Sequence, residues 1–283
     1  MNKDRMILID GNNLLFRMFF GIPNKIYDSE GVLIHGIVGF VGSLLKTIKE
    51  YEPNYLAVIF DSEVPSEKFE DINYKKNRIM DYSNVPDEEN PFSQLPDIKK
   101  CLRYMGISYI EKEKCEADDV IATICKSYKN DMQEIIVVST DKDYFQLIDD
   151  KINVLCPRGK NSILYNTTMI KERFGILPNQ YICYSSMVGD KSDNIPGISG
   201  IGKVTASKLI NKYNDIENIY KNLESVRPGV SKKLEENFDK VMNNMYLISM
   251  NSKLNIDIQL KDFSIEFCKY KEMKTMSILS KAR

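Results

Sequence analysis

Short apolar runs alternate with longer segments of helical periodicity through the first 165 residues of the chain. Because each run is strongly apolar and four to seven residues long, we interpret it as a buried strand. The runs that predict strands are 5–9, 55–60, 107–110, 134–140 and 151–155. The segments that predict helices are 36–51, 96–106, 116–128 and 144–148. Apolar strands separated by helices are typical of an α/β fold with a mostly parallel central sheet flanked by helices.

The second part of the chain has a different pattern. From about residue 166 we find no confident strand before the end region, only helical pieces joined by Gly- and Pro-rich turns. No linker is long enough to separate two independent domains. We therefore expect an α/β core over 1–165, interrupted by a polar, proline-containing stretch at 62–96, and a helical region over 166–283 packed on that core as one structural unit.

Composition limits the class of protein. The chain has 283 residues, of which 43% are apolar, so it can bury a substantial core. No apolar run approaches the roughly 20 residues that span a bilayer, and the first residues are too polar for a secretory signal. We therefore expect no membrane association and a cytoplasmic location. The six cysteines form no CxxC pair and His35 is the single histidine, so we expect reduced thiols and no zinc site.

Aspartate follows three of the predicted strands. Asp10, Asp61 and Asp141 come after the strands at 5–9, 55–60 and 134–140. The carboxyl ends of parallel strands meet at one edge of a sheet, so we expect these side chains to lie close together. Each aspartate alone could be a turn residue, but three like charges at one edge repel one another unless a cation is present. Asn12-Asn13 predicts the cap of the helix that follows.

Further acids extend this group. Glu116, Asp118 and Asp119 begin the predicted helix after 107–110, where the helix dipole alone stabilises an acid by about 0.3–1 kcal/mol. The remaining acids of the predicted metal site are Asp143, Asp190 and Asp193. Oxygen ligands without histidine favour Mg²⁺, Mn²⁺ or Ca²⁺, and two Mg²⁺ ions about 3.5–4 Å apart suit phosphodiester hydrolysis. Although the net charge is −1, setting these nine acids aside leaves a basic excess suited to nucleic acid.

The segment GISGIGKVT has competing interpretations. Gly197, Gly202 and Lys203 match the phosphate-binding loop GxxxxGK of nucleotide hydrolases. Val204 stands where that loop needs Ser or Thr, and no strand is predicted before Gly197. The favoured alternative is a glycine hairpin between two helices, whose second helix directs its N-terminal amides at a DNA phosphate. An ordinary tight turn between two helices remains open.

Six motifs together resemble the 5′-nuclease (flap endonuclease) family, which includes the N-terminal domain of bacterial DNA polymerase I. They are LIDGNNLLFR, AVIFD, YKKNR, EADDVIA, VVSTDKD and VGDKSDNIPGISGIGKVTA. The resemblance covers about residues 6–213 and is weak over the last 70. It implies a PIN-like fold, a helical arch at 62–96 and a helix-hairpin-helix (helix-three-turn-helix) element at 178–213. It also implies that all nine acids bind two or more Mg²⁺ ions, for which Mn²⁺ can substitute, with K⁺ at the hairpin.

The resemblance also carries roles for basic and glycine residues. The catalytic candidates are Arg17, Lys75 and Arg78. The DNA-binding candidates are Lys68, Lys76, Gly197, Gly200, Gly202, Lys203 and Thr205. Ser66-Glu67-Lys68 stands where the family usually carries Thr-Phe-Arg, and YKKNR alone could be a solvated charge run.

These observations predict a divalent-metal-dependent 5′-3′ exonuclease and structure-specific flap endonuclease. The expected substrates are DNA near the 5′ ends of branched or nicked duplexes, in replication and repair, with RNA primers as a further class. We expect a monomer whose DNA polymerase is supplied by another chain. A catalytically silent DNA junction-binding protein is the alternative, but such a protein would have lost acids, and none of the nine is missing.

Overall fold

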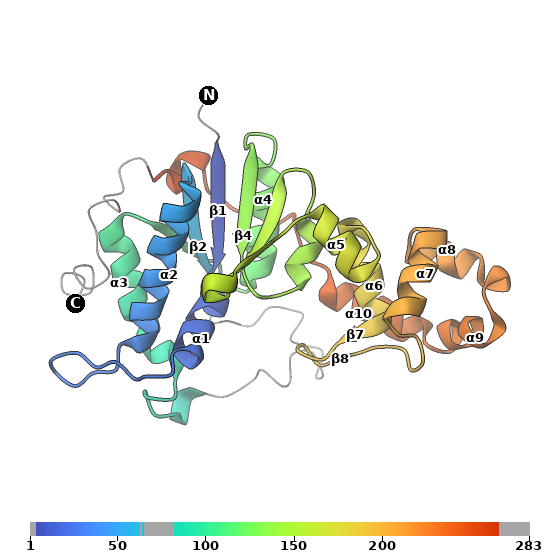
Figure 1. Ribbon diagram of the computed structural model, residues 1–283, viewed down its shortest axis with the longest axis horizontal. Coiled ribbons are helices and arrows are strands. Elements are labelled where there is room, and N and C mark those ends of the chain that lie inside the picture. Colours follow the sequence, from blue (N-terminus) through green and yellow to red (C-terminus); the bar gives the residue numbers. More distant parts are fainter. Residues whose placement is uncertain (1–3, 63, 65–81, 266–283) are drawn as a thin grey trace.

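A six-stranded sheet forms the centre of the molecule (Figure 1). The computed structural model describes residues 4–62, 64 and 82–265. The strand order is β3-β2-β1-β4-β5-β6, and the first five strands are parallel. The strands are β1 (Arg5–Asp10), β2 (Tyr55–Phe60), β3 (Ser108–Glu111), β4 (Glu134–Val138), β5 (Ile152–Cys156) and β6 (Ile163–Tyr165). The mostly parallel sheet is confirmed, but the antiparallel β6 was not predicted, because three residues are too few to show a period.

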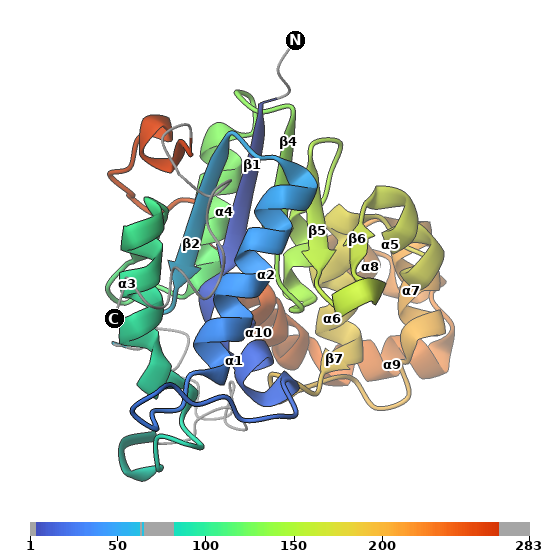
Figure 2. The same ribbon diagram turned by 60° about the vertical axis from the view of Figure 1, so that its left-hand side comes forward.

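Helices cover both faces of the sheet (Figure 2). These are α1 (Gly11–Gly21), α2 (His35–Tyr51), α3 (Leu95–Met105) and α4 (Ala117–Tyr128). Successive side chains of a strand point to opposite faces. Accordingly, Met6 and Leu8 of β1 pack with α4, whereas Ile7 and Ile9 pack with α1, α2 and α3. This double coverage explains why the strands are nearly continuous apolar runs.

The first helix follows the first strand without an intervening turn. Asp10 is both the last residue of β1 and the N-cap of α1, where its side chain accepts a hydrogen bond from the Asn13 amide at 3.0 Å. The predicted cap at Asn12-Asn13 is therefore wrong. Gly11 allows this abrupt passage, because a Cβ there would lie 2.9 Å from the Ile59 carbonyl oxygen and even closer to the Phe60 ring.

Between residues 166 and 265, the chain forms a set of helices and one very short β-hairpin. Its helices are α5 (Thr167–Phe174), α6 (Tyr181–Val188), α7 (Lys203–Tyr213), α8 (Ile216–Lys221), α9 (Pro228–Glu236) and α10 (Phe238–Ile248). Strands β7 (Gly189–Asp190) and β8 (Ile195–Pro196) pair antiparallel between α6 and α7. Because β8 ends directly before Gly197, the expectation that no strand precedes this glycine was wrong. β8 is nevertheless outside the central parallel sheet.

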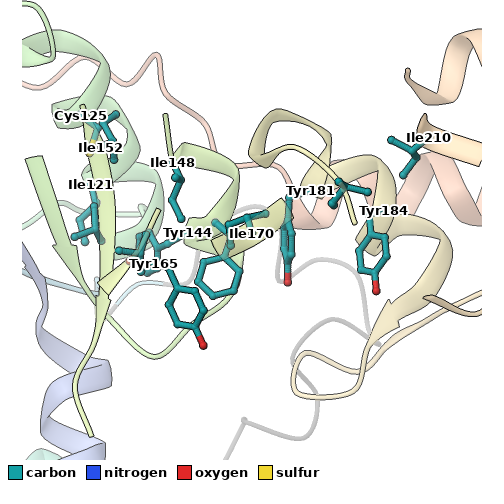
Figure 3. Close-up of a cluster of buried hydrophobic side chains, with 14 of the residues drawn as sticks. Ile121, Cys125, Tyr144, Ile148, Ile152, Tyr165, Ile170, Tyr181, Tyr184 and Ile210 are labelled. Carbon is teal, nitrogen blue, oxygen red and sulfur yellow. The ribbon is translucent and has the colours of Figure 1, made fainter. Parts of the chain in front are cut away.

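One apolar cluster connects the sheet with the helical region (Figure 3). It runs from Ile121 of α4 through Tyr144 to Tyr181 of α6 and Ile210 of α7. Aromatic contacts join the two parts, since the Phe145 ring centroid lies 5.6 Å from that of Tyr181. The two parts therefore share a core, although the boundary at 165/166 stays a prediction.

The connecting segments contain short 3-10 turns. They are Tyr82–Asn84, Pro91–Gln94, Asp143–Leu147, Gly159–Asn161, Pro178–Gln180, Leu223–Ser225 and Leu260–Phe263. The described part of the stretch 62–96 contains two of these turns, Tyr82–Asn84 and Pro91–Gln94, before α3 begins. None of the helices in the described ranges is long and apolar enough to cross a membrane. The free thiols that were expected are confirmed at Cys101, Cys115, Cys125, Cys156 and Cys183.

Candidate metal centre and nucleic-acid interface

Asp10 lies buried at the carboxyl edge of the sheet, where it makes contacts to three segments. Its Oδ1 accepts from the Asn13 amide, while its Oδ2 accepts from Ser139 Oγ at 3.0 Å and from Tyr144 Oη at 3.2 Å. Burial raises the pKa of Asp10 from 3.8 to about 7, with further contributions from the charges of Asp61 and Asp141. The three strand-end aspartates therefore lie together, as expected.

Asp61 ties the end of β2 to the start of α4. Its Oδ1 accepts from the Ala117 amide at 2.8 Å, and its Oδ2 accepts from Asn12 Nδ2 at 2.9 Å. Glu116 is the buried N-cap residue of α4, next to this contact, and its side chain makes no capping hydrogen bond. Two predicted ligands, one after β2 and one at the start of α4, thus lie at the same edge.

Asp143 joins the acids of the helical region to those of the sheet. Burial raises its pKa well above the ordinary value, and the nearby charges of Asp141, Asp193, Asp190 and Asp118 raise it further. Its Oδ1 is buried and has no hydrogen-bond partner in the described part of the chain. A buried acceptor without a partner costs free energy unless a cation or water satisfies it.

The hydroxyl group of Tyr144 lies close to the same group of acids. Burial raises the pKa of its hydroxyl, and so do the charges of Asp10, Asp118, Asp141 and Asp61. The acids that these electrostatic contacts bring together are Asp10, Asp61, Asp118, Asp141, Asp143, Asp190 and Asp193. Seven of the nine predicted ligands therefore interact, and Glu116 lies beside them.

Asp119 differs from its neighbours in the EADD motif. Its buried Oδ1 accepts from the Asn251 amide at 2.7 Å, which fastens the segment after α10 to α4. Thr123, one turn further along α4, receives the Leu254 amide at 3.3 Å on its hydroxyl oxygen. At least one oxygen of Asp119 thus has a structural role that the motif did not predict.

The donor set fits hard divalent cations. It contains only carboxylate oxygens, it includes the unsatisfied Asp143 Oδ1, and its mutual repulsion shows in the raised pKa values of Asp10 and Asp143. Within residues 4–62, 64 and 82–265, no three His, Cys, Asp or Glu side chains are grouped closely enough to hold one ion.

The glycine hairpin lies between α6 and α7. The Ile198 amide donates to the Met187 carbonyl at 2.8 Å, and Gly200 has a φ of +79°, which favours glycine. A Cβ on Gly200 would also collide with the Lys233 side chain. Gly202 is the exposed N-cap of α7 and has nothing within 4 Å of its Cβ position. The backbone amides of Lys203 to Thr205 therefore lie at an accessible helix N-terminus.

Of the basic residues that the sequence analysis selected on α1 and in the stretch 62–96, the structure describes only Arg17. Lys68, Lys75, Lys76 and Arg78 lie outside the described residues and stay predictions. Arg17 lies on α1 and is partly buried. Its pKa is lowered by burial and by the positive charge of Arg158. The nucleotide-hydrolase interpretation of GISGIGKVT gains no support, since Lys203 begins a helix that does not follow a strand of the central sheet.

Several supporting residues were missed by the sequence analysis. Ser139 and Tyr144 hold Asp10, Asn12 holds Asp61, and the Asn13 side chain accepts from the Thr140 amide at 3.0 Å. Asn12 and Asn13 were noticed only as a helix cap. Tyr144 directly follows Asp143 in DKDYF, which is the one local signal that could have identified it.

Comparison with known families decides the relationship. Residues 5–175 match the profile described as 5′-3′ exonuclease, N-terminal resolvase-like domain. The chain belongs to the 5′-3′ exonuclease family. Residues 176–271 match its companion, 5′-3′ exonuclease, C-terminal SAM fold. The PIN-like sheet and the helical second part are thereby confirmed as the fold of this family.

Related proteins agree with this assignment. DNA polymerase I of Caldicellulosiruptor bescii is 33% identical over 265 residues, which cover 91% of this chain and 30% of the polymerase. The chain thus spans about a third of the length of such relatives. The bacteriophage T5 D15 flap endonuclease, solved with DNA and metal ions, is 21% identical with a TM-score of 0.73, covering 98% of this chain and 100% of that one. The catalytic core of Rad2 with DNA substrate is 21% identical with a TM-score of 0.60, covering 90% and 82%. These two structures share the fold.

Proposed function

We propose that this chain is a divalent-metal-dependent nuclease that hydrolyses DNA phosphodiesters near the 5′ ends of branched or nicked duplexes. The observation that carries the proposal is the group of seven interacting carboxylates at the carboxyl edge of the sheet, in a member of the 5′-3′ exonuclease family. Such a concentration of like charge is costly in a folded protein and is typical of a site built for cations.

The metal ligands are proposed from the same geometry. They are Asp10, Asp61, Glu116, Asp118, Asp141, Asp143, Asp190 and Asp193. We propose Mg²⁺ as the natural ion and Mn²⁺ as a substitute, because both prefer oxygen ligands. When bound, the ions would activate a water and stabilise charge on the phosphate oxygens. One carboxylate oxygen of Asp119 accepts a hydrogen bond from the Asn251 amide, so the assignment of Asp119 as a metal ligand stays a prediction.

The chain's own residues orient these ligands. Ser139 and Tyr144 donate to Asp10, which holds its Oδ2 at the end of β1. The Ala117 amide and Asn12 fix both oxygens of Asp61. Preorganised ligands lower the reorganisation that the reaction needs, because the site keeps its geometry while charge develops.

DNA binding is proposed at the glycine hairpin and the start of α7. The support is the accessible helix N-terminus at Gly202–Thr205 and the fold shared with structures that were solved with DNA. A phosphate placed there would meet helix amides and the positive end of the helix dipole. K⁺ at the hairpin, the arch contacts of Lys75 and Arg78, RNA primers, a separate polymerase and the monomeric state stay predictions.

The test is the length of the products from end-labelled substrates. Flap, nicked and blunt duplexes, each with a 5′ label, are incubated with Mg²⁺ or with EDTA. We expect cleavage near the 5′ end of flap and nicked DNA that EDTA abolishes. A protein that binds the junctions but cuts none of them with Mg²⁺ or Mn²⁺ would instead be the catalytically silent junction-binding protein. A 5′-RNA arm of the same assay tests primer removal.

A further inference from the structure

Three basic side chains lie near the end of β5, outside the group of seven interacting carboxylates. They are Arg17 on α1, Lys46 on α2 and Arg158 in the segment between β5 and the turn Gly159–Asn161. Three separate elements contribute these side chains. The positions of the three residues follow from contacts of their neighbours.

Arg17 is directed by the first turn of its helix. Asn13 Oδ1 accepts from both the amide and the hydroxyl of Thr140, at 3.0 and 2.9 Å, so this face of α1 lies against the end of β4. Arg17 stands one turn later on the same helical face, because residues four apart are neighbours on a helix surface. The charges of Arg158 and Cys156 act on Arg17, so its guanidinium group lies near the end of β5.

Arg158 follows the end of β5 and is exposed. Cys156, at the end of β5, contacts the Ser139 carbonyl oxygen through its Sγ at 3.2 Å. The backbone amide of Arg158 donates to Ser162 Oγ at 3.0 Å, which fixes the turn. Lys46 Nζ donates to the Gly159 carbonyl oxygen at 3.0 Å and so holds this turn against α2. The charges of both Arg158 and Arg17 act on the Cys156 thiol.

Among residues 4–62, 64 and 82–265, the two guanidinium groups have no acidic partner. Neither Arg17 nor Arg158 appears in an ion pair there, whereas Lys129 pairs with Asp149. Partial burial lowers the pKa of Arg17, and the positive charge of Arg158 lowers it further. Holding two like charges together without a counterion is unfavourable, so the arrangement suits a ligand that supplies negative charge.

We propose that Arg17 and Arg158 together bind one phosphate group of the substrate strand beside the metal centre, with Lys46 as a positioning residue for the turn that carries Arg158. This inference rests on the proposed nuclease function and adds Arg158 and Lys46 to its site. Guanidinium forks match the oxygens of a phosphate, so two neighbouring guanidinium groups can share one phosphate. The phosphate is either a terminal 5′-phosphate monoester or an internal phosphodiester, which share this chemistry.

The test compares DNA affinity in single-charge variants. Binding of a fluorescent nicked duplex is measured by anisotropy with Ca²⁺ in place of Mg²⁺, for the parent, Arg158→Ala, Arg158→Lys and Arg103→Ala. Arg103 is a matched control, because it is exposed and contacts Tyr109 of β3, at the opposite edge of the sheet. We expect Arg158→Ala to weaken binding about tenfold and to lower the salt slope by about one. Arg158→Lys should recover part of the affinity, and Arg103→Ala should match the parent.

Modified substrates distinguish the two kinds of phosphate. If the ligand is the terminal monoester, a 5′-hydroxyl substrate weakens binding to the parent but causes no further loss in Arg158→Ala. If it is an internal diester, one methylphosphonate position in a scan has this property instead. A parent that cuts DNA while Arg158→Ala and Arg103→Ala bind every substrate equally would overturn this inference alone. A parent that neither binds nor cuts DNA would overturn the proposed function together with it.

Discussion

Asp10 combines three tasks in one carboxylate. It ends a strand, caps a helix through the Asn13 amide, and offers a buried negative charge to the acidic edge. The capping contact stabilises the charged form, but burial outweighs it and raises the pKa of Asp10 to about 7. In the metal-free protein this residue therefore opposes folding at neutral pH.

The first prediction concerns pH and the metal-free protein. Between pH 3.8 and about 7, the folded state holds a proton on Asp10 that the unfolded state has lost, so the stability falls as pH rises through this window. We expect the metal-free protein to be less stable at pH 8 than at pH 5, with Asp10 contributing on the order of a few kcal/mol. Asp10→Asn should flatten this difference in thermal melts in EDTA. An unchanged pH dependence in Asp10→Asn would contradict the assignment.

The second prediction separates two neighbours in EADD. Asp119→Ala leaves the Asn251 amide without its acceptor and should lower the free energy of unfolding by about 1.5–3 kcal/mol. Asp118→Ala removes a charge from the repelling group and should leave the stability equal or raise it. Urea unfolding of the two variants measures the difference. Equal destabilisation by both substitutions would show that Asp119 has no special structural role.

At the scale of elements, the strand ends determine where the site forms. The parallel strands β1, β2 and β4 bring their carboxyl ends to one edge of the sheet, and the start of α4 lies there too. The long apolar strands and the helices between them were predictable, because each shows a period over several residues. Strands β6, β7 and β8 were not, since two or three residues carry no period and their pairing depends on the surrounding chain.

The third prediction tests the start of α7. Gly202→Ala should fold normally, because nothing lies within 4 Å of its Cβ position, and yet its methyl group would obstruct a phosphate approaching the helix amides. We expect weaker duplex binding with an unchanged melting temperature. Gly229→Ala is the matched control, also with open space at its Cβ. Gly200 is less suitable, since its positive φ would add strain. Duplex affinity of Gly202→Ala equal to that of Gly229→Ala would argue against this interface.

At the scale of the whole molecule, a shared core holds the two halves of the acidic site together. Asp190 and Asp193 come from the helical region, whereas Asp10 and Asp141 come from the sheet. The nine acids were predicted from motifs and family resemblance, and seven of them interact in the structure. Their support could not, because the Tyr144–Asp10 contact joins residues 134 positions apart and the Asp119–Asn251 contact joins residues 132 apart. Such pairings depend on the folded chain.

The fourth prediction tests this shared core. Phe145 lies between the two parts, with ring centroids 4.7 Å from Tyr165 and 5.6 Å from Tyr181. Phe145→Ala should cost about 3–5 kcal/mol and shift one cooperative unfolding transition. Calorimetry of the parent and the variant provides the measurement. Two separate transitions in the parent, with only one of them shifted in the variant, would mean that the parts unfold independently.

The central claim is that the carboxyl edge of the sheet binds divalent cations for phosphodiester hydrolysis. The most direct measurement is the anomalous scattering of crystals grown with Mn²⁺, combined with Mn²⁺-dependent cleavage of a nicked duplex by the same preparation. We expect Mn²⁺ peaks among Asp10, Asp118 and Asp141, and the loss of both the peaks and the cleavage in Asp10→Asn. Two results would contradict the claim that this edge binds the catalytic cations. One is that the parent protein cleaves DNA although its crystals show no Mn²⁺ at this edge. The other is full cleavage by Asp10→Asn.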